Sequence, residues 1–253
     1  MSPVPLTVIT GFLGAGKTTL LNRLLADPAL AGTVAIINEF GEIGLDHLFV
    51  ETRDDGLVLL SSGCLCCTVR GDLVATLEDL LDKADSGGLD LRRVVIETTG
   101  LADPAPVLQA VLAHPLLLVR YALDGIVTLV DAVNGAATLD AYAEAVKQVA
   151  VADRIVLTKT DLPEAAATRT TLARRVQRLA PGAPVLDAAA GEADAAALLG
   201  CGPFDPATKI ADVGLWLRDE AVRDAAGHAG HAGHDHGPER DQAAHDVNRH
   251  DAS

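Results

Sequence analysis

The chain has 253 residues, of which 49% are hydrophobic and 3% aromatic, and its formal net charge is −15. This length accommodates one large α/β domain or two small ones, with a core built mainly from aliphatic side chains. The acidic balance leaves no basic surface for a phosphate backbone, so we expect no nucleic-acid partner and favour a cation or another protein.

Short runs of β-branched and aliphatic residues alternate with helical patterns along the chain. Seven runs predict buried strands, at residues 6–10, 34–38, 57–60, 94–96, 126–130, 155–157 and 185–186. Apolar residues at helical spacing predict helices at residues 19–25, 72–82, 107–112, 140–151, 164–179 and 192–199. This alternation predicts an α/β fold with a mostly parallel central sheet of about seven strands and helices on both faces.

A glycine-rich turn separates the first predicted strand from the first helix. Residues 11–18, GFLGAGKT, fit the pattern G-x-x-x-x-G-K-[ST]. The backbone amides of such a turn close around a phosphate, Lys17 reaches the β- and γ-phosphates, and Thr18 offers its hydroxyl to Mg²⁺. The motif predicts a P-loop NTPase domain, which we place at residues 1–205.

The predicted strand at residues 94–96 runs into a carboxylate, Glu97. A carboxylate at this position helps to bind the Mg²⁺ shell and senses the γ-phosphate, and Gly100 can offer its backbone amide to the terminal phosphate. The predicted catalytic residues are therefore Lys17, Thr18 and Glu97.

The predicted strand at residues 155–157 ends at Thr158-Lys159-Thr160-Asp161, which resembles the N/T-K-x-D element of guanine-specific P-loop proteins. Asp161 can accept hydrogen bonds from both N1–H and the exocyclic amine of guanine, whereas adenine would leave it unpaired. Lys159 can place its methylene stem on the base plane. We therefore favour GTP over ATP. The residues expected to bind the nucleotide are Gly11, Gly14, Ala15, Gly16, Lys17, Thr18, Thr19, Gly100, Thr158, Lys159 and Asp161.

Three of the four cysteines lie within residues 64–67, CLCC. Near-adjacent thiols rarely form a disulfide without strain, which indicates reduced cysteines. Thiolates at this spacing can share a cation such as Zn²⁺ or Co²⁺, with Glu39, Glu42 or His114 completing the coordination. Buried structural cysteines or a redox pair remain alternatives. The predicted metal ligands are Cys64, Cys66, Cys67, Glu39 and Glu42, with Thr18 for Mg²⁺.

The two ends of the chain carry less structural information. The N-terminus shows no cleavable leader and no apolar stretch is long enough to span a membrane, so we expect a cytoplasmic protein without a membrane partner. Residues 206–226 are predicted to be a short, partly helical connecting segment. Residues 227–253 lack apolar periodicity and predict a disordered, acidic, His-rich tail, whose imidazoles can bind Zn²⁺, Ni²⁺ or Co²⁺ weakly.

Together these motifs resemble the CobW-type family of P-loop GTPases, which act as metal chaperones or metallocofactor-insertion proteins. The resemblance rests on residues 9–19, 38–42, 63–67, 97–104 and 152–162. It implies a cycle in which GTP binding orders the loop after residues 34–38 and shapes the cysteine site, and hydrolysis releases the metal to a client protein. Family members usually carry a smaller C-terminal α/β domain, which we expect to be absent here.

The leading hypothesis is therefore a GTP-hydrolysing metallochaperone that binds Zn²⁺ or Co²⁺ at the C-x-C-C site and transfers it to a client metalloprotein. One alternative is a metal store in which the histidine tail binds the metal. Another is a GTP-dependent regulator whose cysteines are structural. The metal, the client and the oligomeric state, including a homodimer, stay open.

Overall fold

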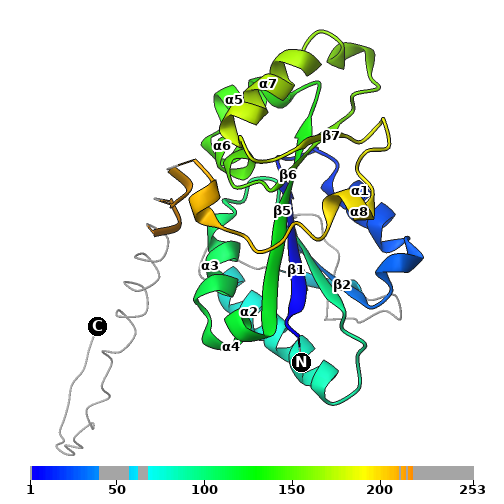
Figure 1. The fold of residues 1–253 in the computed structure, drawn as a ribbon, viewed down its shortest axis with the longest axis vertical. Helices are drawn as coiled ribbons and strands as arrows, with labels where there is room; N and C mark the ends of the chain where they lie inside the picture. Colours follow the sequence, from blue (N-terminus) through cyan, green and yellow to red (C-terminus); the bar gives the residue numbers. More distant parts are fainter. Residues whose placement is uncertain (1, 40–56, 62–67, 211, 215, 219–253) are drawn as a thin grey trace, which may run out of the picture.

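The computed structural model describes residues 2–39, 57–61, 68–210, 212–214 and 216–218. Within them, seven strands form one sheet in the order β3-β2-β4-β1-β5-β6-β7 (Figure 1). Each neighbouring pair of strands is parallel. The predicted parallel sheet of about seven strands is confirmed. The strands are β1 (Val4–Gly11), β2 (Thr33–Glu39), β3 (Leu57–Ser61), β4 (Arg93–Glu97), β5 (Tyr121–Asp131), β6 (Arg154–Thr158) and β7 (Val185–Asp187).

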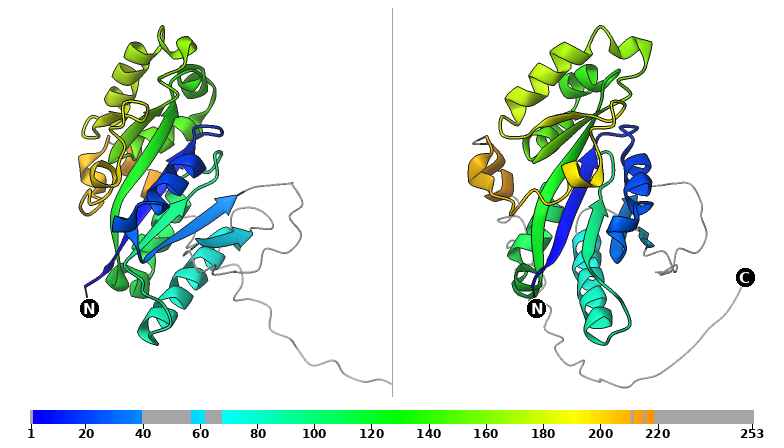
Figure 2. Two further views of the ribbon diagram at one scale, coloured as in Figure 1. Left: turned by 90° about the vertical axis from the view of Figure 1, so that its right-hand side faces the viewer. Right: turned by 45° about the vertical axis from the view of Figure 1, so that its right-hand side comes forward.

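Helices cover both faces of the twisted sheet, which Figure 2 shows from two further sides. They are α1 (Lys17–Leu25), α2 (Thr68–Asp85), α3 (Ala105–Ala113), α4 (Pro115–Arg120), α5 (Gly135–Ala141), α6 (Ala143–Ala150), α7 (Arg169–Leu179) and α8 (Ala195–Leu198). The described residues also include the 3₁₀ turns η1 (Pro28–Leu30), η2 (Pro163–Ala165) and η3 (Pro206–Thr208). Among the described residues, no helix is long and apolar enough to cross a membrane.

The alternation of side chains along β2 illustrates how the two faces are filled. Val34 and Ile36 belong to a core cluster with residues of α2, α3 and α4, whereas Ala35 and Ile37 belong to a second cluster with residues of α1 and α8. Because successive side chains of a strand point to opposite faces, β2 is apolar on both sides. Accordingly, α1 and α8 lie on one side of the sheet in Figure 1, and α2, α3 and α4 on the other.

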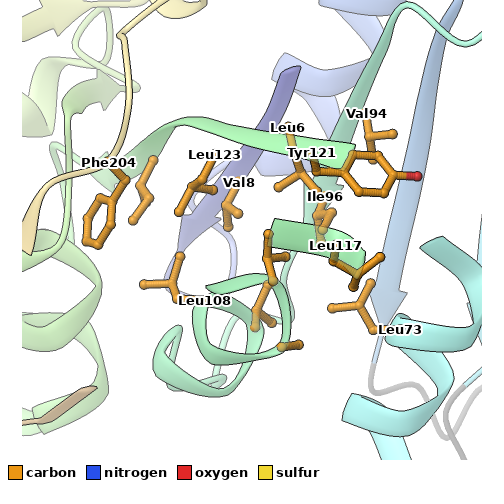
Figure 3. Packing of buried hydrophobic residues seen from close by; sticks show 14 of the residues in the cluster. Leu6, Val8, Leu73, Val94, Ile96, Leu108, Leu117, Tyr121, Leu123 and Phe204 are labelled. Carbon is orange, nitrogen blue, oxygen red and sulfur yellow. The ribbon is translucent and has the colours of Figure 1, made fainter. Parts of the chain in front are cut away.

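The first core cluster also includes residues that come after the last strand. Figure 3 shows the apolar side chains of β1 and β4 facing Leu108 of α3 and Leu117 of α4, with Phe204 at one end of the cluster. Val213 and Leu217 are buried in the same cluster. The chain beyond β7 therefore packs against the domain at least as far as Leu217.

Several elements differ from their predicted bounds. The predicted helix at residues 140–151 is two helices, because Tyr142 has an extended backbone between α5 and α6. The ring of Tyr142 packs against Phe12, with centroids 4.5 Å apart. The predicted helix at 164–179 begins only at Arg169, after the turn η2. The strand predicted at 126–130 begins five residues earlier, at Tyr121.

Candidate nucleotide site

The glycine-rich turn lies at the carboxyl end of β1, the central strand of the sheet. Gly11 has a φ of +142°, and a Cβ at this position would lie 2.5 Å from the carbonyl oxygen of Leu129 on β5. Only glycine fits such a close approach. Gly16, with a φ of +90°, is the N-cap of α1, and no side chain among the described residues caps the first amides of the helix. The amides at the beginning of a helix point toward its N-terminus and favour an anion there.

The first two residues of α1 carry the polar groups of the turn. The Lys17 ammonium donates a hydrogen bond to the carbonyl oxygen of Phe12 (3.3 Å) and is largely buried. The Thr18 hydroxyl donates a hydrogen bond to Oε1 of Glu97 (2.7 Å), although the two residues lie 79 positions apart in the sequence. Glu97 is the last residue of β4 and pairs with Ile9 of β1 in the sheet register. The hydroxyl and the carboxylate are hard oxygen ligands of the kind that Mg²⁺ prefers, so they fit this cation.

The loop after Glu97 packs directly on the glycine-rich turn. The Thr98 amide donates to the carbonyl oxygen of Ile9 (3.0 Å), and its hydroxyl donates to the Thr10 hydroxyl (2.8 Å). At Gly100, a Cβ would lie only 2.6 Å from both Cα and N of Leu13. The backbone of Gly100 is therefore in close contact with the turn.

The predicted base-recognition residues lie on the other side of the turn. The Thr158 hydroxyl donates to the carbonyl oxygen of Ala15 (2.9 Å), which ties the end of β6 to the glycine-rich turn. Asp161 is exposed, as a carboxylate available to a ligand must be in the free protein. Thr160 donates a hydrogen bond to Asp187, which attaches the loop after β6 to the end of β7.

Sequence reasoning missed the environment of Lys159. Among the described residues, Lys159 is the only one other than glycine with a positive φ, of 57°. Its ammonium binds Oδ2 of Asp131 at the end of β5 (2.7 Å). Burial alone would raise the pKa of Asp131, but hydrogen bonds from Lys159, from Asn134 and from two backbone amides lower this pKa below its ordinary value. The sequence feature that could have indicated this contact is the position of Asp131, directly after the predicted strand at residues 126–130.

A cavity of about 280 Å³ lies beside the glycine-rich turn. The turn lines one side of it, and β5, α5, α6 and Lys159 line the others. The polar side chains that line this cavity include Asp131, Asn134, Thr138 and Gln148.

Most of the predicted metal ligands cannot be placed. Cys64, Cys66, Cys67 and Glu42 lie outside the described residues, as do residues 227–253. The backbone of Glu39 ends β2, where it pairs with Ser61, three residues before Cys64. Nε2 of His114 lies 3.7 Å from Oε1 of Glu78 on α2. Where the chain is described, no group of three or more His, Cys, Asp or Glu side chains could bind a metal ion.

The parallel sheet, the glycine-rich turn after β1 and the contact between Thr18 and Glu97 define a P-loop nucleotide-binding protein. More particularly, the chain belongs to the CobW/HypB/UreG nucleotide-binding domain family, whose model matches residues 5–187.

Two relatives show how the chain compares with known proteins. It is 41% identical over 204 residues to the zinc chaperone YjiA of Escherichia coli K12, covering 81% of this chain and 63% of that protein. It is 37% identical over 169 residues to the zinc-regulated GTPase metalloprotein activator 1 of Schizosaccharomyces pombe, covering 64% of this chain and 40% of that protein. The chain therefore spans less than two thirds of the length of either relative.

A solved structure resembles this fold as well. The crystal structure of the Zn(II)-bound YjiA GTPase from E. coli has a TM-score of 0.63 to this chain and is 38% identical to it. The match covers 81% of this chain and 64% of the crystallised one. The nucleotide-binding part of the two proteins is thus alike in both sequence and fold.

Proposed function

We infer that the chain binds GTP with Mg²⁺, hydrolyses it, and uses the cycle to bind and release a transition metal that passes to a client metalloprotein. The observation that carries this proposal is the hydrogen bond between Thr18 and Glu97 directly beside the glycine-rich turn. It is supported by the names of the relatives, a zinc chaperone and a zinc-regulated GTPase. These names favour Zn²⁺ over Co²⁺ as the metal.

In this proposal the glycine-rich turn and the first amides of α1 bind the phosphates, and Lys17 moves from Phe12 to the β- and γ-phosphates. Thr18 and Glu97 would hold Mg²⁺, which neutralises charge on the phosphate oxygens when it is bound. The Gly100 amide binds the terminal phosphate, and Asp161 selects guanine. Each of these roles uses a group that lies at the carboxyl edge of the sheet.

The metal is the cargo of the cycle, bound by Cys64, Cys66 and Cys67 with Glu39 or Glu42. The pairing of Glu39 with Ser61 supports this grouping, because it brings the end of β2 next to the segment that leads to the cysteines. Thiolate ligands suit Zn²⁺, and a coordination sphere that the protein only partly fills suits release. We place this activity in the cytoplasm, where thiols stay reduced.

Nucleotide binding provides the test, with Lys17→Ala as the variant and Lys83→Ala as its control. Lys83 is an exposed helix lysine paired with Asp79, so its removal should leave nucleotide affinity unchanged. Loss of the Lys17 contacts should weaken GTP binding about 100-fold, the size expected for charge-assisted hydrogen bonds. Titration of a fluorescent GTP analogue, with ATP and GTP as competitors, measures both effects. Equal GTP affinity in the two variants, or equal competition by ATP, would contradict the proposal.

A further inference from the structure

Two adjacent side chains of α6 contact the loop that follows Glu97. Gln148 is 1% exposed, and its amide nitrogen donates hydrogen bonds to the carbonyl oxygens of Gly100 (3.2 Å) and Ala102 (3.0 Å). Lys147 forms an ion pair with Asp103 in the same loop. The loop is therefore attached to α6 at three residues, Gly100, Ala102 and Asp103.

The chemistry of Gln148 fixes the direction of these contacts. Both neighbours are carbonyl oxygens, which only accept hydrogen bonds, so only the amide nitrogen of Gln148 can face them. Its own carboxamide oxygen is buried and has no donor among the described residues. A buried polar atom without a partner is costly, so packing alone would not favour a glutamine at position 148.

The helix itself is anchored at the same residue. Thr128, fully buried on β5, donates its hydroxyl hydrogen bond to the backbone carbonyl of Gln148 (2.6 Å). On its opposite side, the loop meets the glycine-rich turn, where Gly100 lies in close contact with Leu13. Gly100 is thus confined between the turn and a helix that the sheet holds in place.

We propose that Lys147 and Gln148 are positioning residues for the nucleotide site, which hold Gly100 where its amide can bind the terminal phosphate of GTP. Their effect falls on GTP and not on GDP, because only GTP has the phosphate that this loop would reach. This inference rests on the proposed function and adds to it the residues that set the preference for the triphosphate.

One of these two residues, Lys147, also contacts the C-terminal segment. The Lys147 ammonium lies 5.7 Å from the ring centroid of Trp216, within range of a cation–π contact. Gln109 of α3 donates a hydrogen bond to the carbonyl oxygen of Leu217 (2.9 Å). The chain that continues past the domain is thereby packed against the residues that position Gly100.

The test is Gln148→Met, which keeps the length of the side chain and removes both hydrogen bonds. Its control is Gln177→Met on α7, since Gln177 likewise donates to three loop carbonyls, those of Ala180, Pro181 and Ala183, away from the glycine-rich turn. Affinities of the full-length protein for a non-hydrolysable GTP analogue and for GDP are measured by calorimetry with Mg²⁺. We expect Gln148→Met to weaken analogue binding about tenfold and GDP binding less than about twofold, with Gln177→Met unchanged.

Equal losses for both nucleotides, or no loss, would overturn the assignment. If Gln148→Met does not fold, Lys147→Met supplies the same test, because this side chain is partly exposed and its removal breaks the contacts to Asp103 and Trp216. We expect it to weaken analogue binding about threefold without affecting GDP, and an unchanged ratio of the two affinities would overturn the proposal. A wild-type protein that binds neither nucleotide refutes the proposed function itself.

Discussion

The close contact between the glycine-rich turn and the loop after Glu97 makes Gly100→Ala an informative substitution. A methyl group at this position would lie 2.6 Å from Cα and N of Leu13. Carbon atoms in ordinary contact are about 3.5–4.0 Å apart, so the two loops must separate by roughly 1 Å. Both contacted atoms belong to the backbone of the glycine-rich turn, so no side chain can rotate away to relieve the overlap.

Two effects of different size follow from this displacement. Overpacking of this kind costs about 1–3 kcal/mol of unfolding free energy, which lowers the Tm of a domain of this size by roughly 2–12 °C. A displacement of about 1 Å at groups that position a reacting phosphate can lower the rate by about 100-fold. We therefore expect the Gly100→Ala variant to hydrolyse GTP far more slowly than the wild type at temperatures where it is still folded.

Thermal unfolding and steady-state GTP hydrolysis separate the two effects. Gly71→Ala is the matched control, since Gly71 lies in α2 and a Cβ there meets no atom of the described residues within 4 Å. Because alanine favours a helix over glycine, this variant should gain about 0.5–1 kcal/mol and hydrolyse GTP normally. If Gly100→Ala unfolded and hydrolysed GTP like the wild type, the close contact between the loops would be refuted.

Two further substitutions test the base side of the site and the metal ligands. Asp131→Asn removes the charge that binds Lys159 and should lower the unfolding free energy at pH 7 by about 1–2 kcal/mol. Since the folded-state pKa of Asp131 is lowered, its stabilisation is present above the unfolded pKa of about 3.9 and disappears as the pH falls through the folded pKa; urea unfolding at neutral and acid pH checks this. Replacing Cys64, Cys66 and Cys67 by Ser should abolish stoichiometric Zn²⁺ binding in a chelator competition, whereas Cys201→Ser should not. Retained binding in the triple variant that disappears when residues 227–253 are deleted would favour a histidine store instead.

Much of the fold can be predicted from short segments of the sequence. The strands alternate with helices at spacings that only a parallel sheet satisfies, and the glycine-rich turn is recognisable because a few adjacent residues carry its geometry. The break at Tyr142 was not predictable in this way. Apolar spacing continues across it, and the extended residue is stabilised by a ring contact with Phe12, 130 positions earlier in the chain.

The contacts that complete the nucleotide site could not be predicted either, because they join residues that lie far apart in the sequence. Lys159 meets Asp131 across 28 positions, and Gln148 meets Gly100 across 48. The first pair joins the ends of the adjacent strands β5 and β6, and the second joins α6 to the loop after β4, so no pattern within one element predicts these contacts. The burial of Val213 and Leu217 is similar, since most residues of their core cluster lie in elements that precede β7.

In the proposed cycle, the state of the nucleotide controls the affinity for the metal. The most direct measurement is a competitive Zn²⁺ titration against a chelator, in the presence of Mg²⁺, on the same protein loaded first with a non-hydrolysable GTP analogue and then with GDP. We expect one Zn²⁺ to bind through the cysteines, more tightly in the GTP-like state than in the GDP state. Equal Zn²⁺ affinity in the two states would contradict it.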